Sequence, residues 1–234
     1  MSKLITPPKL QSFLEKLNTK FGKFIILRGY RSLPISYSND IDVFVPKQDV
    51  VRFLRCLTDL DGLNTSVSIL VSRLGLIKCD LVLESETIPF DILYGFYYFG
   101  LDYQDCEDLY QKSVLHHSQL FYTPVISDEI RISLLKELLH NNRVRTDKAA
   151  YLFDMLNECR LEIPTHFFNL KTVDLVADSI RDDNLELPDL SMRLKRDLLK
   201  HNLSEHLFLT IGNIFLFAAV KYIFKNSYHK NIIR

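Results

Sequence analysis

Two aspartates separated by a single residue, Asp40 and Asp42, lie in a segment (residues 40–45) that is otherwise rich in Ile, Val and Phe. That composition is typical of a β-strand, and side chains alternate along a strand. The two carboxylates are therefore expected on one face and the apolar side chains on the other. Adjacent like charges destabilise a fold unless cations or donors neutralise them. Mg²⁺ takes oxygen ligands from one or two carboxylates together with substrate phosphates, so the pair predicts a magnesium site.

Hydrophobic periodicity predicts the elements that position this strand. Apolar residues at helical spacing predict an amphipathic helix over residues 8–21, which Gly22 ends. A continuous apolar run predicts a strand over residues 24–27. A polar loop then leads to the strand at residues 41–45, and helical spacing returns over residues 50–57.

Two further strands are predicted at residues 76–83 and 88–94, joined by the polar tetrapeptide at residues 84–87. This spacing is typical of a β-hairpin. The order helix, strand, strand, helix, strand, strand indicates a mixed α/β layer rather than a series of regular βαβ crossovers.

The second half of the chain has a helical pattern. Apolar residues over 130–139 follow helical spacing, with Asp128 as the expected N-cap, and Thr146 is expected to cap the next helix. The sequence therefore predicts an α/β (α+β) fold in two domains. A small mixed-sheet domain covers residues 1–125, and an all-helical domain covers residues 126–234.

Composition and charge limit the classes of function. The 234 residues contain 29 Lys and Arg and 29 Asp and Glu, so the net charge is zero and no nucleic-acid partner is expected. The four cysteines lie far apart, without the spacing of a zinc or redox motif. No N-terminal signal peptide is recognisable, which favours a cytoplasmic protein with reduced thiols.

An apolar run of fourteen residues, Leu207–Val220, lies near the end of the sequence with basic residues on both sides. It is shorter than the roughly 20 residues that a helix needs to span a bilayer. Two interpretations stay open. One is a buried final helix followed by a basic tail, and the other is an interfacial helix at the inner face of an anionic membrane.

The tripeptide Leu27-Arg28-Gly29, followed after a loop by Asn39 and the Asp-Ile-Asp-Val strand, resembles the signature of the nucleotidyltransferase superfamily with the DNA polymerase β-like fold. That family places a glycine turn about ten residues before a D-x-D strand. The resemblance covers about residues 20–100. Within it, the segment is similar to that of a bacterial subgroup that occurs in polysaccharide, capsule or lipopolysaccharide assembly.

The resemblance implies Mg²⁺-dependent transfer of a nucleoside monophosphate from an NTP to a hydroxyl or phosphate acceptor. Asp40 and Asp42 would bind the metal, and Asp91, on a later strand of the same sheet, would complete the catalytic and metal-binding triad. Asp80 is the competing candidate for the third carboxylate. Asp91 is preferred because apolar residues flank it on both sides, as they flank the D-x-D pair.

On the nucleotide side, the resemblance implies that Gly29 lets backbone N–H groups approach the phosphates. Arg28 and Arg31 would counter phosphate charge or form ordinary ion pairs, and Ser32 would supply a hydroxyl. The family usually has Ser or Gly after the glycine, where this chain has Tyr30. That departure favours an alternative, a catalytically inactive protein that binds or scaffolds glycan-biosynthesis enzymes. A toxin- or antitoxin-type transferase acting on protein or tRNA is a third possibility.

Overall fold

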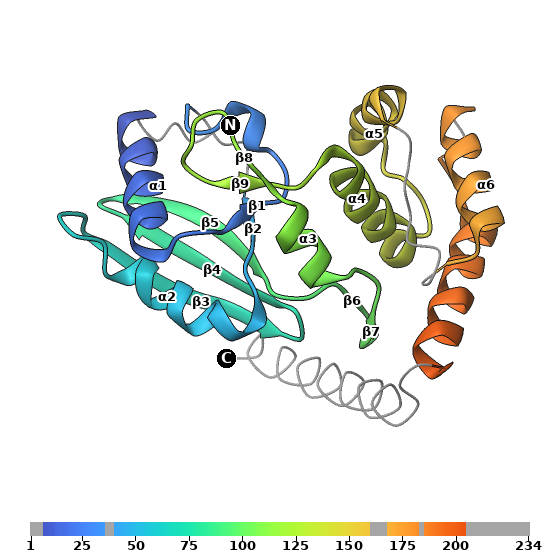
Figure 1. Ribbon diagram of the computed structural model, residues 1–234, viewed down its shortest axis with the longest axis horizontal. Helices are drawn as coiled ribbons and strands as arrows, with labels where there is room; N and C mark the ends of the chain where they lie inside the picture. Colours follow the sequence, from blue (N-terminus) through green and yellow to red (C-terminus); the bar gives the residue numbers. More distant parts are fainter. Residues whose placement is uncertain (1–6, 36–39, 160–167, 183–184, 205–234) are drawn as a thin grey trace, which may run out of the picture. The chain divides into compact units, whose positions relative to one another are not determined.

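A computed structural model describes residues 7–35, 40–159, 168–182 and 185–204, and these residues form a mixed α/β structure, as predicted (Figure 1). The strands of its main sheet are β1 (Ile25–Ile26), β2 (Ile41–Phe44), β3 (Thr65–Arg73), β4 (Leu76–Leu83), β5 (Glu86–Leu93), β8 (Val114–Leu115) and β9 (Tyr122–Thr123). Their order is β3-β4-β5-β2-β1-β9-β8. The sheet is mixed, because β2 runs parallel to β5 but antiparallel to β1.

One face of this sheet packs against α1 (Pro7–Phe21) and α2 (Val50–Thr58). Alternate side chains of β2, β4 and β5 point into this core: Ile41, Val43, Ile77, Cys79, Leu81, Leu83, Ile88, Phe90 and Ile92. Phe13 of α1 and Phe53 of α2 are fully buried in the same cluster. Burying a side chain of this size contributes about 1.5–3 kcal/mol. Because strand side chains alternate, the residues between these positions lie on the opposite face of the sheet.

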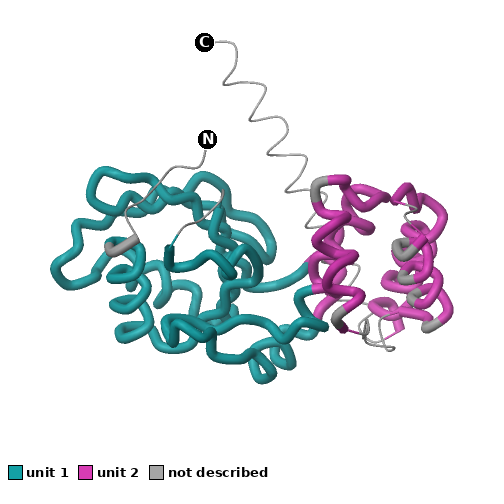
Figure 2. The backbone as a smooth tube through the Cα atoms, turned by 90° about the horizontal axis from the view of Figure 1, so that it is seen from above, with its two compact units in different colours: residues 1–96, 105–129 teal, residues 97–104, 130–234 magenta. Residues whose placement is uncertain are grey.

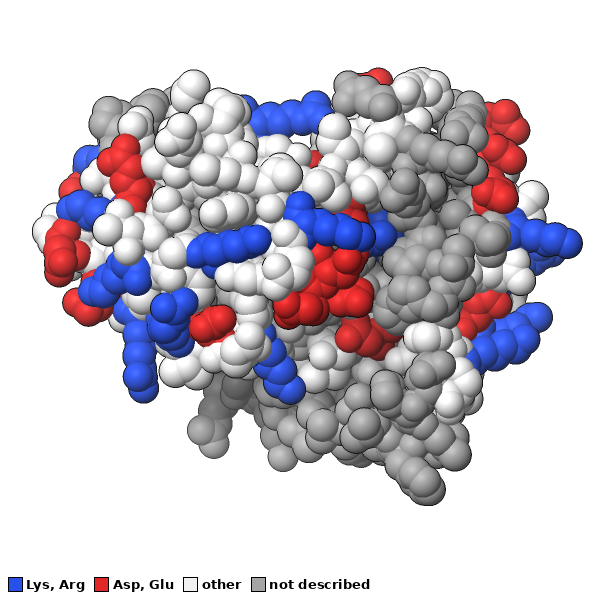
Figure 3. All heavy atoms as spheres, in the orientation of Figure 1, with Lys and Arg blue, Asp and Glu red and all other residues white. Residues whose placement is uncertain are grey.

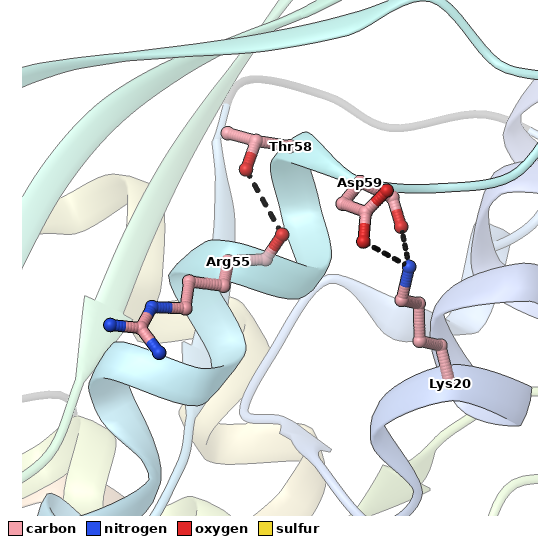
Figure 4. Close-up of polar contacts among 4 residues, drawn as sticks. All are labelled: Lys20, Arg55, Thr58 and Asp59. Carbon is pink, nitrogen blue, oxygen red and sulfur yellow. Dashed lines mark hydrogen bonds and ion pairs between the residues drawn. The ribbon is translucent and has the colours of Figure 1, made fainter.

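Lys20 joins the C-terminal ends of the two helices (Figure 4). Its ammonium donates to the backbone carbonyl of Asp59 and, over 2.6 Å, to the Asp59 carboxylate Oδ2. Thr58 Oγ1 donates to the carbonyl of Arg55 at 3.0 Å, which satisfies one of the carbonyls left open at the end of α2. Asp59 is largely exposed, so this pair contributes little to stability and mainly fixes where the helices end.

The predicted elements of the first half are present with changes at their ends. The predicted hairpin is β4–β5, which turns at Glu84 with φ 58°. β1 has two residues instead of the predicted four, because only Ile25 and Ile26 pair with their neighbours as a ladder. Part of the predicted loop is a short 3₁₀ helix, η1 (Tyr30–Ser32).

Neither β3 nor α3 (Cys106–Lys112) was predicted. β3 is an edge strand whose side chains are mostly exposed, so neither of its faces is consistently buried. It therefore lacks the buried apolar face by which a strand is recognised in a sequence. Its register also shifts between Ile69 and Val71. The seven residues of α3 are too few for a helical period to stand out.

The second half contains α4 (Ile126–Asn141), α5 (Thr146–Glu158), α6 (Leu170–Arg181) and a helix over residues 188–204. Both predicted N-caps are wrong by one or more residues. α4 begins at Ile126, so Asp128 lies inside its first turn, where a carboxylate still suits the helix dipole. Thr146 is the first residue of α5, and Arg145 precedes it.

The chain divides into two compact units (Figure 2). The first comprises residues 1–96 and 105–129, and the second comprises residues 97–104 and 130–234. The second unit takes the hairpin β6 (Tyr97–Tyr98) and β7 (Leu101–Asp102) from the middle of the chain. The predicted division into sheet and helical domains at residue 125 stays a prediction.

The apolar run Leu207–Val220 lies outside the described residues. Among the helices that are described, none combines the length and the apolar character needed to cross a bilayer.

Candidate functional site

The structure brings Asp40, Asp42 and Asp91 together. Each offers a carboxylate oxygen that lies within 4.8 Å of the others. β2 and β5 are neighbouring parallel strands, and their register places Asp42 directly beside Asp91. Asp40 immediately precedes β2, two residues before Asp42, so strand alternation keeps both on the same face. This is the sheet face opposite the one that α1 and α2 cover.

Two of these carboxylates are deeply buried. Asp42 is 3% exposed and Asp91 is 7% exposed, whereas Asp40 is half-buried. A buried carboxylate is costly unless it is paired and hydrogen-bonded. Here the chain supplies cations of its own, because Arg28 Nε donates to Asp42 Oδ2 and Lys78 Nζ donates to Asp91 Oδ2.

Lys78 reaches Asp91 because of the strand register. β4 is antiparallel to β5, with Lys78 opposite Asp91, so Asp42, Asp91 and Lys78 form a row across three adjacent strands. The Nζ–Oδ2 distance is 2.6 Å, and the Lys78 side chain is 41% exposed against 10% for Asp91. Arg28 and Lys78 thus neutralise two of the three carboxylates. Charge balance at this site does not by itself require a metal ion.

Arg28 lies just beyond β1, where the chain leaves the sheet. The amide of Leu27 donates to the carbonyl of Asp42 at 2.9 Å and holds this segment alongside β2. Burial lowers the pKa of the Arg28 guanidinium, but the nearby carboxylates of Asp42, Asp40 and Asp91 raise it by more, so the pKa lies above its ordinary value. Arg28 therefore stays charged beside all three carboxylates.

Gly29 makes the turn that follows Arg28. Its backbone is left-handed, with φ 68° and ψ 10°, and it leads directly into η1. Leaving aside its two chain neighbours, a Cβ added at this position would meet no atom within 4 Å. Glycine is therefore favoured here by the backbone conformation and not by a lack of space.

Tyr30, which follows Gly29, is held by a side chain of another element. Its hydroxyl donates to the carboxylate of Glu129 in the first turn of α4. Its ring meets the His116 ring edge to face, with centroids 5.8 Å apart, and packs against the main core. Burial and then the bond to Glu129 raise the pKa of the Tyr30 hydroxyl well above its ordinary value, so it remains a neutral donor.

The remaining predicted residues lie near this turn or on the same sheet. Arg31 and Ser32 are exposed on η1, and their phosphate-binding role stays a prediction. Asp80 lies two residues beyond Lys78 on β4, opposite Pro89 of β5, and is outside the group of three carboxylates.

The sequence analysis missed Lys78 and Glu129. Lys78 had a usable signal, since it occupies a polar position in the alternating pattern of β4. No sequence signal pointed to Glu129, because it bonds to Tyr30 across 99 residues of sequence.

The surface drawn in Figure 3 carries basic and acidic side chains interspersed among the described residues, consistent with a net charge of zero. We found no family model, curated protein or solved structure that matches this chain.

Proposed function

We propose that the chain is a Mg²⁺-dependent nucleotidyltransferase that moves a nucleoside monophosphate from an NTP to a hydroxyl or phosphate acceptor in surface-glycan biosynthesis. Residues 1–125 would form the nucleotidyltransferase-like domain and residues 126–234 an all-helical domain. The supporting observation is the convergence of Asp40, Asp42 and Asp91 on one sheet face, beside the left-handed turn at Gly29.

The donor set fits the metal. Three carboxylates with oxygens within 4.8 Å of one another are hard ligands of the kind that Mg²⁺ prefers. Asp40, Asp42 and Asp91 would hold the ion, which when bound offsets the charge of a triphosphate and polarises its oxygens.

Protein side chains act in phosphoryl transfer mostly by positioning the reactants and compensating charge, and each residue of the site would have one such role. Asp91 would accept the proton of the acceptor hydroxyl. The Gly29 turn would present backbone N–H groups to the phosphates, with Arg31 and Ser32 as further donors from the exposed η1 segment. Arg28, which stays charged at the edge of the carboxylate cluster, would orient the triphosphate.

A specific observation favours a second candidate, a catalytically inactive protein that binds glycan-biosynthesis enzymes. Arg28 and Lys78 already pair with Asp42 and Asp91, so two of the three carboxylates have cationic partners without a metal. In this alternative the carboxylates are structural, and neither Mg²⁺ nor an NTP binds to them.

Calorimetry distinguishes the two candidates. NTP binding is measured with and without Mg²⁺ for the wild type, for Asp40→Ala/Asp42→Ala and for Asp80→Asn. The last variant is a matched control, because Asp80 lies on the same sheet but outside the carboxylate group. The enzyme predicts Mg²⁺-dependent binding that the double variant loses and the control keeps. Absence of NTP binding under every condition supports the scaffold protein.

The proposed setting adds a membrane surface. Leu207–Val220 and the basic residues around it would contact anionic lipid at the inner face of the membrane. Co-sedimentation with vesicles of phosphatidylglycerol, compared with neutral phosphatidylcholine, tests this. Equal binding to both, or binding to neither, contradicts it.

A further inference from the structure

The turn at Gly29 is held on both sides by charge-assisted hydrogen bonds. On its N-terminal side Arg28 donates to Asp42, and on its C-terminal side Tyr30 donates to Glu129. Glu129 is 1% exposed, so its carboxylate provides a fixed and desolvated acceptor for the Tyr30 hydroxyl. The only residue between the two anchored side chains is the glycine itself.

The ring of Tyr30 also has a rigid neighbour. His116 is buried, stacks on Phe121 with centroids 4.4 Å apart, and its Nδ1 lies 2.9 Å from the Ser118 hydroxyl. Tyr30 therefore packs its ring edge to face against a side chain that is itself fixed by two contacts. The hydroxyl and the ring hold Tyr30 independently, and substituting Phe removes only the first of these anchors.

Both anchors of Tyr30 belong to other elements, since Glu129 lies on α4 and the Tyr30 ring packs against His116 and the main core. Gly29 is exposed, and apart from its two chain neighbours no residue has an atom within 4 Å of the position that a Cβ would take. A large residue directly after a phosphate-binding glycine would obstruct the ligand if its side chain folded back over the turn. The bond to Glu129 and the packing of the ring against the core hold the Tyr30 side chain on other elements.

From this geometry we infer that Tyr30 is a positioning residue for the nucleotide. By donating to Glu129 it fixes the Gly29 turn in the conformation that binds the triphosphate and keeps its own ring off that surface. This inference rests on the function proposed above. It assigns to Tyr30 and Glu129 a role in nucleotide affinity that leaves metal binding by the carboxylates unchanged.

The test uses the full chain and four variants. Tyr30→Phe removes the hydroxyl and keeps the ring, Glu129→Ala removes the acceptor, and Glu129→Gln retains an oxygen that can accept the bond. Tyr110→Phe is the matched control, since its hydroxyl donates to the carbonyl of Lys23 at 3.4 Å, away from the turn. Affinities for ATP, CTP, GTP and UTP with Mg²⁺, and for Mn²⁺ alone, are measured by calorimetry.

We expect Tyr30→Phe and Glu129→Ala to weaken binding of the preferred nucleotide about tenfold. Glu129→Gln should stay within about threefold of the wild type, and Tyr110→Phe should match it. Mn²⁺ affinity should be unchanged in all four. If Tyr30→Phe binds nucleotide as the wild type does, or loses Mn²⁺ affinity to the same extent, the positioning role is wrong.

Hydrogen exchange separates this inference from the proposed function. Faster exchange of the amides of residues 29–33 in Tyr30→Phe than in Tyr110→Phe supports the anchoring of the turn, whether or not a nucleotide binds. Equal exchange in the two variants overturns it. Failure of the wild type to bind any of the four nucleotides refutes the proposed function and, with it, the nucleotide role of Tyr30.

Discussion

Replacing Lys78 with Met tests both the charge balance of the site and its affinity for a metal. The Lys78–Asp91 bond is charge-assisted, and such bonds contribute about 1.5–3 kcal/mol. The Asp91 side chain is 10% exposed, so it cannot regain full hydration when its partner is lost. Lys78 is 41% exposed, which weakens the pair through solvent screening. The expected loss in the free energy of unfolding is therefore about 2 kcal/mol, or roughly 5 °C in Tm.

Mg²⁺ should restore most of this loss. The three carboxylates together with Arg28 and Lys78 carry a net charge of −1, and Lys78→Met changes the net charge of the cluster to −2. The more negative cluster should bind Mg²⁺ about tenfold more tightly, which corresponds to about 1.4 kcal/mol of extra stabilisation in excess metal. The variant should then be about 2 kcal/mol less stable than the wild type in EDTA, and only about 0.6 kcal/mol less stable in excess Mg²⁺.

Urea unfolding in EDTA and in excess Mg²⁺ measures both effects. Lys78→Arg keeps the charge and should lose little. Lys9→Met is the matched control, because Lys9 pairs with Glu84 at the surface, where both side chains are about 40% exposed. Lys9→Met should unfold at nearly the same urea concentration as the wild type, with no dependence on Mg²⁺. If Mg²⁺ stabilises neither the wild type nor Lys78→Met, the carboxylates are not a metal site.

Three other substitutions test the Gly29 turn, the core and the buried His116. Gly29→Ala should cost about 1 kcal/mol in chemical denaturation, because φ is 68° although space is open; a loss above about 3 kcal/mol would show a hidden clash. Phe53→Ala should cost about 3–5 kcal/mol, since the ring is fully buried and meets Phe21 edge to face at 4.9 Å; a thermal shift under 2 °C would contradict this. Burial and the neighbouring His117 lower the pKa of His116, so the unfolded chain takes up this proton first and stability falls as the pH drops below about 6.5. His116→Phe should reduce this fall between pH 7 and pH 5, and an unchanged pH profile would exclude His116 as its source.

The sequence predicted the elements whose pattern is local and strong. α1, α2 and the β4–β5 hairpin were found because each buries one continuous apolar face against the same core. β3 escaped prediction, because an edge strand with two exposed faces has no such pattern. The N-cap at Asp128 was misplaced because polar side chains near a helix start fit several positions of the first turn.

At the site, side-chain alternation was enough to predict that Asp40 and Asp42 share a face, since it depends only on immediate neighbours. The sequence also offered both Asp91 and Asp80 as the third carboxylate. Only the tertiary structure placed Asp91 in the group, because the parallel register of β2 and β5 sets Asp42 beside it.

The tertiary structure alone also decided how the charges are balanced and where Tyr30 is directed. Arg28 and Asp42 are 14 residues apart, Lys78 and Asp91 are 13 apart, and Tyr30 and Glu129 are 99 apart. Such pairs depend on which elements are neighbours and, between strands, on the register in which they pair. Local periodicity carries no information about either, because it records only which face of an element is buried.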